Sequence, residues 1–97
     1  MDLQIQGRNI DMSDDDRVYV AWKIERTERH TNLPMEAHVV VSKQSTRSQQ
    51  DRMTVEATLT CAGLVLRGLE RAPTLQAAVD ALSDTLDRRV AQFKARL

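Results

Sequence analysis

Few residues of this chain have the types and spacing that catalysis or metal binding would require. Its two histidines, His30 and His38, and its single cysteine, Cys61, are scattered along the sequence. A zinc site needs three or four ligands, and these residues do not show the paired spacing of such sites. Cys61 shares strand parity with Leu59, which favours a buried core residue over a nucleophile. We therefore expect no enzyme, no cofactor and no metal site.

Basic side chains are the other residues that could do chemistry, because arginine and lysine bind the phosphates of nucleic acids. The 97-residue chain carries 14 basic and 14 acidic side chains, so its formal net charge is zero. Nucleic-acid-binding domains usually carry a net positive charge. Any contact with RNA must therefore depend on where along the fold the charges lie.

On a helical wheel, residues 13–31 separate their charges when Val20, Ile24 and Thr27 face the core. One flank is basic and lies beside Tyr19 and Trp22; its members are Lys23, Arg26, Arg29 and His30. Trp22 lies off the core stripe, where it could stack on an unpaired base, pack over the sheet edge or form a dimer contact.

The C-terminal segment, from Leu75 to Leu97, shows the same trend of early acids and late bases. With Leu82, Leu86 and Phe93 inward, Arg88 and Arg96 project to one flank and Arg89 lies at the rim of the apolar stripe. Lys94 lies on the opposite side, with Asp80 and Asp87. If the two helices lie parallel, their basic ends form a local positive patch. The alternative is solvated helix faces, stabilised by the helix dipole and by i,i+4 pairs such as Glu25–Arg29 and Asp84–Arg88.

The elements that must position these residues follow from the apolar pattern. Strands with alternating apolar residues are expected over 2–7, 35–42, 53–61 and 64–70, and the wholly polar segment 43–52 is expected to be a mobile hairpin loop. Helices are expected from Ser13 to about Thr31 and from Thr74 onward, with Ser13 and Thr74 as N-caps. One sheet face is expected to be polar, with Gln4, Gln6, Glu36, His38, Thr54, Glu56, Thr58 and Thr60.

This order, β-α-β-β-β-α, predicts a two-layer α+β fold, in which a four-stranded sheet has both helices on its apolar face. We expect one domain over residues 1–97, since the length suits a single modest core. The sequence shows no apolar run of membrane-spanning length and no signal peptide at its start, and it has one unpaired cysteine. We therefore expect a cytoplasmic protein.

A series of short segments runs in order over nearly the whole chain: Leu3–Asn9, Arg17–Val20, Lys23–Ile24, Glu28–His30, Ala37–Ser42, Val55–Leu59, Ala77–Leu82 and Leu86–Arg88. This series resembles the ribosome hibernation-promoting factors, also called ribosome-associated inhibitor or sigma-54 modulation proteins. No single segment is specific, and it is their order that carries the resemblance.

The resemblance implies a fold similar to double-stranded RNA-binding domains. It also implies binding to ribosomal RNA of the small ribosomal subunit, in the channel used by messenger and transfer RNA. Translation would be inhibited by occlusion and idle ribosomes would be stabilised, with no DNA, membrane or small-molecule substrate as partner. By motif position the implied rRNA contacts are Arg8, Lys23, Arg26, Arg29 and Arg88, and charge adds His30, Arg89, Lys94 and Arg96.

The chain departs from the family pattern at three positions. Gln76 stands where the family often has tyrosine, Thr85 where it often has lysine, and Thr27 where leucine is usual. Long family members continue through a linker into a dimerising domain, so this chain is either a short-type factor or the N-terminal domain of a long one. The alternative function is a protein-interaction module of the same fold without RNA binding, sensitive at apolar surface positions such as Val40.

Overall fold

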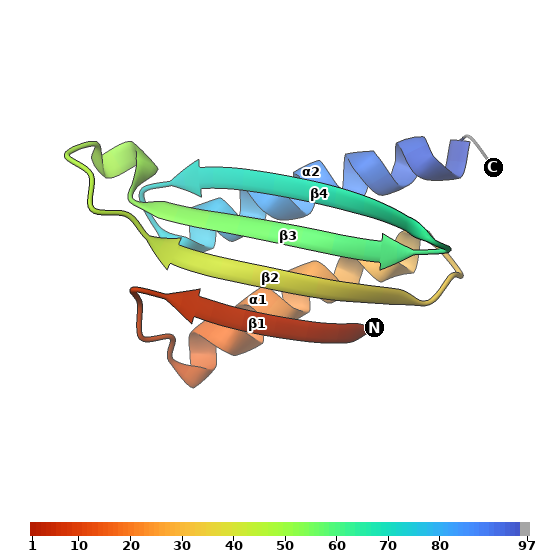
Figure 1. The fold of residues 1–97 in the computed structure, drawn as a ribbon, viewed down its shortest axis with the longest axis horizontal. Helices are drawn as coiled ribbons and strands as arrows, with labels where there is room; N and C mark the ends of the chain where they lie inside the picture. Colours follow the sequence, from red (N-terminus) through yellow and green to blue (C-terminus); the bar gives the residue numbers. More distant parts are fainter. Residues whose placement is uncertain (96–97) are drawn as a thin grey trace.

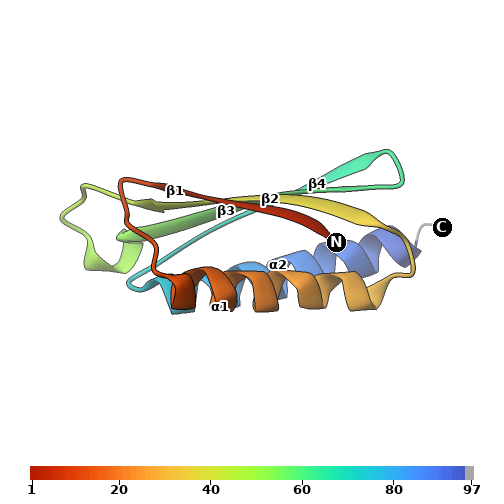
Figure 2. The same ribbon diagram turned by 90° about the horizontal axis from the view of Figure 1, so that it is seen from below.

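The computed structural model describes residues 1–95, except for the side chain of His30. Along the chain the elements are β1 (Asp2–Arg8), α1 (Asp14–Glu25), η1 (Arg26–His30), β2 (Met35–Lys43), η2 (Gln49–Asp51), β3 (Met53–Cys61), β4 (Leu64–Ala72) and α2 (Leu75–Ala95). Figure 1 shows the strands side by side with both helices behind them, and Figure 2 shows the resulting two layers. The predicted two-layer α+β fold is confirmed.

The four strands form one sheet in the order β1-β2-β3-β4. β1 is parallel to β2, while β2–β3 and β3–β4 are antiparallel. A parallel pair needs a crossover connection, which α1 supplies on one face of the sheet. The β3–β4 hairpin turns through Ala62 and Gly63, whose φ angles of 51° and 77° are the positive values that a tight hairpin requires.

Both helices begin at the predicted caps. The Ser13 hydroxyl accepts a hydrogen bond from the Asp16 backbone N–H at 3.0 Å, and the Asp16 carboxylate accepts one from the Ser13 N–H at 3.1 Å. The Thr74 hydroxyl accepts a hydrogen bond from the Ala77 N–H at 3.1 Å in the same way. Each cap satisfies backbone donors that the helix itself leaves unpaired. The first helix then tightens into the 3-10 turns of η1 before it ends at Thr31.

The core lies between the sheet and the two helices. Val20 and Ile24 of α1 and Leu82 and Leu86 of α2 are fully buried, as the apolar stripes predict. α2 approaches the sheet closely at Gly68, because a Cβ atom there would lie 2.9 Å from Cδ1 of Leu82. The helices are therefore held against one face by apolar packing, which leaves their outer flanks to solvent.

Two details of the sheet differ from the expected pattern. Thr54 is buried, not exposed on the polar face, because it is a short side chain on an inner strand, in register between Ser42 and Arg71. Thr54 shares the strand parity of Glu56 and Thr58, as predicted, and only its burial was not predicted. β4 extends beyond its predicted end to Ala72 and carries the exposed apolar side chains Val65 and Leu69.

Candidate nucleic-acid interface

The two helices lie parallel and in step. The Tyr19 hydroxyl donates a hydrogen bond to the Asp80 carboxylate, 61 residues further along the chain. The Ser83 hydroxyl donates to the backbone carbonyl of Lys23 at 3.3 Å, 60 residues back. Both helices run towards the same end of the molecule (Figure 2). The late, basic turns of α1–η1 and α2 are therefore level with one another.

Asp80 of α2 contacts two residues of α1, Tyr19 and Lys23. The Tyr19 hydroxyl that donates to it lowers the pKa of the Asp80 carboxyl, and the same bond raises the pKa of Tyr19. Lys23 forms an ion pair with Asp80, with Nζ and Oδ1 separated by 3.3 Å. The charge of Lys23 is therefore largely balanced inside the protein, and this predicted RNA contact also has a structural role.

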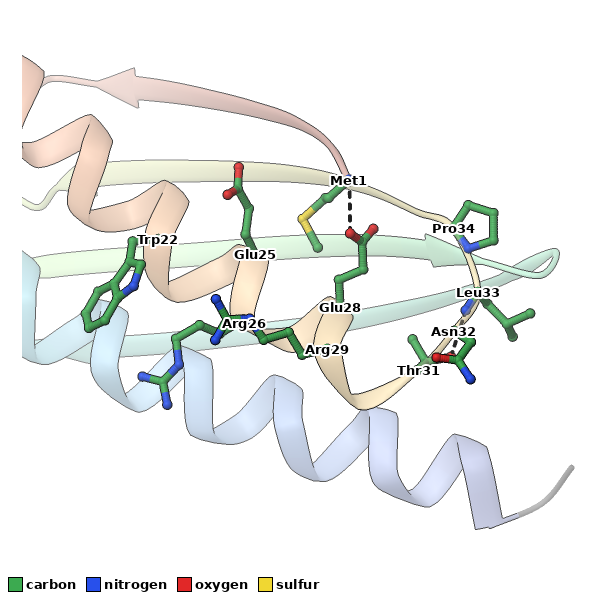
Figure 3. Close-up of a pocket in the computed structure, with 10 residues that line it drawn as sticks. All are labelled: Met1, Trp22, Glu25, Arg26, Glu28, Arg29, Thr31, Asn32, Leu33 and Pro34. Atoms are coloured by element: carbon green, nitrogen blue, oxygen red, sulfur yellow. Dashed lines mark hydrogen bonds and ion pairs between the residues drawn. The ribbon is translucent and has the colours of Figure 1, made fainter.

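Arg26 and Arg29 differ from Lys23, since both are exposed and neither forms an ion pair within the described residues. The expected Glu25–Arg29 pair is absent from this described region, and Figure 3 shows Glu25 directed towards β1. Glu28 is also on that side, where its carboxylate accepts from the N-terminal ammonium group at 3.1 Å. The acids are thus held on the β1 flank, and two arginines remain available to a ligand.

Trp22 lies among these basic side chains, with 54% of its surface exposed. The Arg26 guanidinium carbon lies 5.4 Å from the centre of its ring and the Lys23 ammonium 5.9 Å. Figure 3 shows Trp22, Arg26 and Arg29 around an open hollow that continues to Pro34. We call Trp22 and Lys23 of α1, together with Arg26 and Arg29 of η1, the α1 basic flank.

The basic side chains of α2 lie level with the α1 basic flank but not all on the same side. Arg88 donates to the Thr85 hydroxyl at 3.3 Å, and Thr85 donates to the Glu70 carboxylate of β4 at 2.7 Å. These two hydrogen bonds place Arg88 on the β4 side of α2. The expected Asp84–Arg88 ion pair is not among those of the described residues. Arg89 is also exposed.

Lys94 is exposed near the end of α2, two heptads after Asp80, and so it lies on the flank nearer α1. Arg8 lies elsewhere: it ends β1, in register with Ser42, at the opposite end of the molecule from Arg29 (Figure 1). The structure therefore does not bring Arg8 together with the helical arginines. The side chain of His30 and the whole of Arg96 lie outside the described residues.

In the described part of the chain, no group of three or more His, Cys, Asp or Glu side chains could hold a metal ion. Cys61 is buried, as its strand parity predicted. None of the helices described is both long and apolar enough to cross a membrane.

Comparison with known proteins identifies the family. Residues 3–97 match the family described as Sigma 54 modulation protein / S30EA ribosomal protein. The chain belongs to this family. The resemblance carried by the ordered short segments is thereby confirmed.

Two named relatives and two solved structures show the extent of the similarity. The ribosome hibernation promotion factor of Deinococcus radiodurans is 33% identical over 93 residues, covering 96% of this chain and 49% of that protein. The ribosome hibernation promoting factor of Azotobacter vinelandii is 30% identical over 96 residues, covering 99% of this chain and 85% of that protein. The chain thus spans about half the length of the first relative and most of the second.

The Thermus thermophilus Protein Y N-terminal domain has a TM-score of 0.84 at 29% identity, covering 96% of this chain and 99% of that one. A ribosomal subunit interface protein from Coxiella burnetii has a TM-score of 0.82 at 18% identity, covering 98% of this chain and 99% of that one. The second likeness shows the fold alone.

Two features of this surface were not predicted from the sequence. One is the link from Asp80 to Tyr19 and Lys23, and the other is the chain from Arg88 through Thr85 to Glu70. Both join residues of different elements, so no spacing within a single helix could reveal them. The only local signal was the polar residue Thr85 beside an apolar stripe.

Proposed function

We propose that residues 1–97 form a single ribosome-binding domain that inhibits translation and stabilises idle ribosomes in the cytoplasm. Relatives named ribosome hibernation promotion factor support a ribosome-associated role. In this proposal the domain occupies the channel for messenger and transfer RNA on the small ribosomal subunit. Its action is steric and requires no catalysis, cofactor or metal.

The single observation that carries this proposal is the parallel, in-step packing of the two helices. It brings Arg26 and Arg29 level with Arg88 and Arg89 in a chain whose formal charge is zero. Arginine at such positions contacts phosphate oxygens, which fix the position of a protein on RNA without reading its sequence. Lys94 adds a further cation to this end of the helical layer.

Arg8 has a separate place in the proposed complex. It lies at the far end of the fold from the α1 basic flank, so one short RNA segment cannot contact both. If Arg8 binds ribosomal RNA, it binds a second segment, as expected for an elongated domain with extents of 43 × 24 × 18 Å in a channel walled by RNA. The contribution of His30 remains a prediction from charge.

Co-sedimentation with small ribosomal subunits at low and high salt tests the proposal. We expect the wild-type chain to pellet with the subunits at low salt and to be released at high salt, because phosphate contacts displace counterions. The double variant Arg26→Glu/Arg88→Glu should lose binding. Arg67→Glu/Arg71→Glu is the matched control: it makes the same change in net charge, at exposed residues of β4 on the sheet face away from the helices.

Failure of the wild-type chain to bind at low salt would contradict the proposal. Equal loss in both double variants would mean that net charge alone drives binding and that the helices do not form the interface. The alternative, a protein-interaction module, predicts binding that changes little with salt and falls on substitution of exposed apolar residues of the sheet. Val65 and Leu69, which are 53% and 45% exposed, and the half-buried Val40 are the positions to test.

A further inference from the structure

Trp22 is the one tryptophan of the chain and one of its most exposed large apolar side chains. We propose that its ring is a stacking platform for an unpaired nucleobase of RNA, with Arg26 and Arg29 bound to the phosphates beside that base. This inference rests on the proposed function and specifies the nucleotide chemistry that the α1 basic flank recognises.

The position of the ring is set before any ligand binds. Trp22 packs against Tyr19, with ring centroids 6.2 Å apart and the planes tilted by 54°. Tyr19 is itself held by its hydrogen bond to Asp80 on the other helix. The aromatic pair is therefore anchored across the helical layer, which lowers the entropy lost when a base stacks on the exposed ring.

The charges around the ring favour a nucleotide over an apolar protein surface. The Arg26 guanidinium carbon lies 5.4 Å from the ring centre, and Arg26 forms no ion pair within the described residues. An apolar partner that covered Trp22 would remove water from this guanidinium without balancing its charge, which is costly. A nucleotide supplies both an aromatic face for the ring and a phosphate for the arginine.

The direct test measures binding of two labelled oligomers at low salt: an eight-nucleotide oligoadenylate, and an abasic ribose-phosphate oligomer of the same length. We expect the wild-type chain to prefer the oligoadenylate. Trp22→Ala should weaken oligoadenylate binding roughly 5- to 150-fold, the range for loss of one base–aromatic stack, and leave binding of the abasic oligomer unchanged. Trp22→Phe should retain most of the preference, since phenylalanine keeps a stacking face.

Intrinsic fluorescence gives a second readout, because all tryptophan emission comes from Trp22. Oligoadenylate should quench it and the abasic oligomer should not. Val18→Ala is the matched control, since Val18 is 67% exposed one turn earlier on the same helix and has no aromatic ring on which a base could stack. This control should bind both oligomers as the wild-type chain does.

Equal affinity of the wild-type chain for the two oligomers, absence of quenching, or an unaltered Trp22→Ala variant would each overturn the stacking proposal. Co-sedimentation separates this failure from failure of the proposed function. Salt-sensitive subunit binding that Trp22→Ala does not weaken overturns stacking alone. The wild-type chain could also show no preference between the oligomers while Trp22→Ala weakens subunit binding. The ring would then pack on ribosomal protein, and this result also overturns the stacking proposal. Preference for oligoadenylate without subunit binding supports stacking and contradicts the ribosomal function.

Discussion

Replacing Thr27 by valine should stabilise the protein, although Thr27 lies fully inside the core. Its side chain is 0% exposed, and its hydroxyl has no hydrogen-bond partner within the described residues. A buried polar group without a partner costs about 1–3 kcal/mol. Valine has nearly the same shape and removes the hydroxyl, and the two residues have similar helix propensity. We therefore expect the free energy of unfolding to rise by about 1 kcal/mol or more.

The assay is denaturant unfolding, analysed with the slope of the transition as a check on two-state behaviour, together with a thermal scan. A gain of about 1 kcal/mol should raise the melting temperature by about 4–8 °C in a domain of this size. Thr85→Val is the matched control, because Thr85 is also buried but donates to Glu70 at 2.7 Å. That variant should lose roughly 1–2 kcal/mol, because it leaves the carboxylate without its donor.

Both variants replace a buried hydroxyl by a methyl group, so a general effect of the methyl group would change the free energy of unfolding in the same direction. Changes of opposite sign would therefore come from the hydrogen bonding of the two hydroxyls. If Thr27→Val were neutral or less stable at an unchanged slope, the Thr27 hydroxyl would have a partner in solution and the reasoning would fail. The same would follow if both variants shifted stability in one direction.

Three further predictions concern packing, pH and salt. Gly68→Ala should cost roughly 1–3 kcal/mol in a denaturant titration, since the new Cβ would lie 2.9 Å from Cδ1 of Leu82; unchanged stability would show that α2 can move away. Tyr19→Phe should destabilise most between about pH 4 and about pH 10, the unfolded pKa values of Asp and Tyr. The pKa of Asp80 is lowered in the folded protein, so the stabilisation by the Tyr19–Asp80 hydrogen bond is lost as the pH falls through that pKa. The pKa of Tyr19 is raised in the folded protein, so the same stabilisation is lost as the pH rises through that pKa. A difference in unfolding free energy between wild type and variant that does not change with pH would contradict this coupling. Arg88→Gln should reduce the slope of log affinity for small subunits against log salt by roughly 0.7–0.9, and an unchanged slope would exclude a phosphate contact there.

Much of the fold could be predicted because its determinants are local. Ser13 and Thr74 cap their helices through bonds to residues only three positions away. The alternation of residues 53–61 predicted which side chains enter the core, because successive strand residues point to opposite faces. The exception was Thr54, whose burial depends on neighbouring strands and not on its own parity.

The candidate site was predictable only in part. The wheel placed Arg26 and Arg29 on one flank of their helix, since that depends on helix periodicity alone. The alternative of solvated helix faces relied on ion pairs from Glu25 to Arg29 and from Asp84 to Arg88, neither of which is among those of the described residues. A spacing of four residues permits such a pair, but competing partners in other elements decide whether it forms.

The sequence by itself determined the elements, their buried faces and the family to which the chain belongs, because these depend on periodicity, capping residues and the order of short segments. Only the tertiary structure decided how the charges are shared. In the folded protein Asp80 forms an ion pair with Lys23, and Arg26 lies beside the exposed ring of Trp22. Arg8 lies at the far end of the sheet from both. The physical reason is that charge balance acts through space, between residues about sixty positions apart, and depends on the direction in which each helix crosses the sheet.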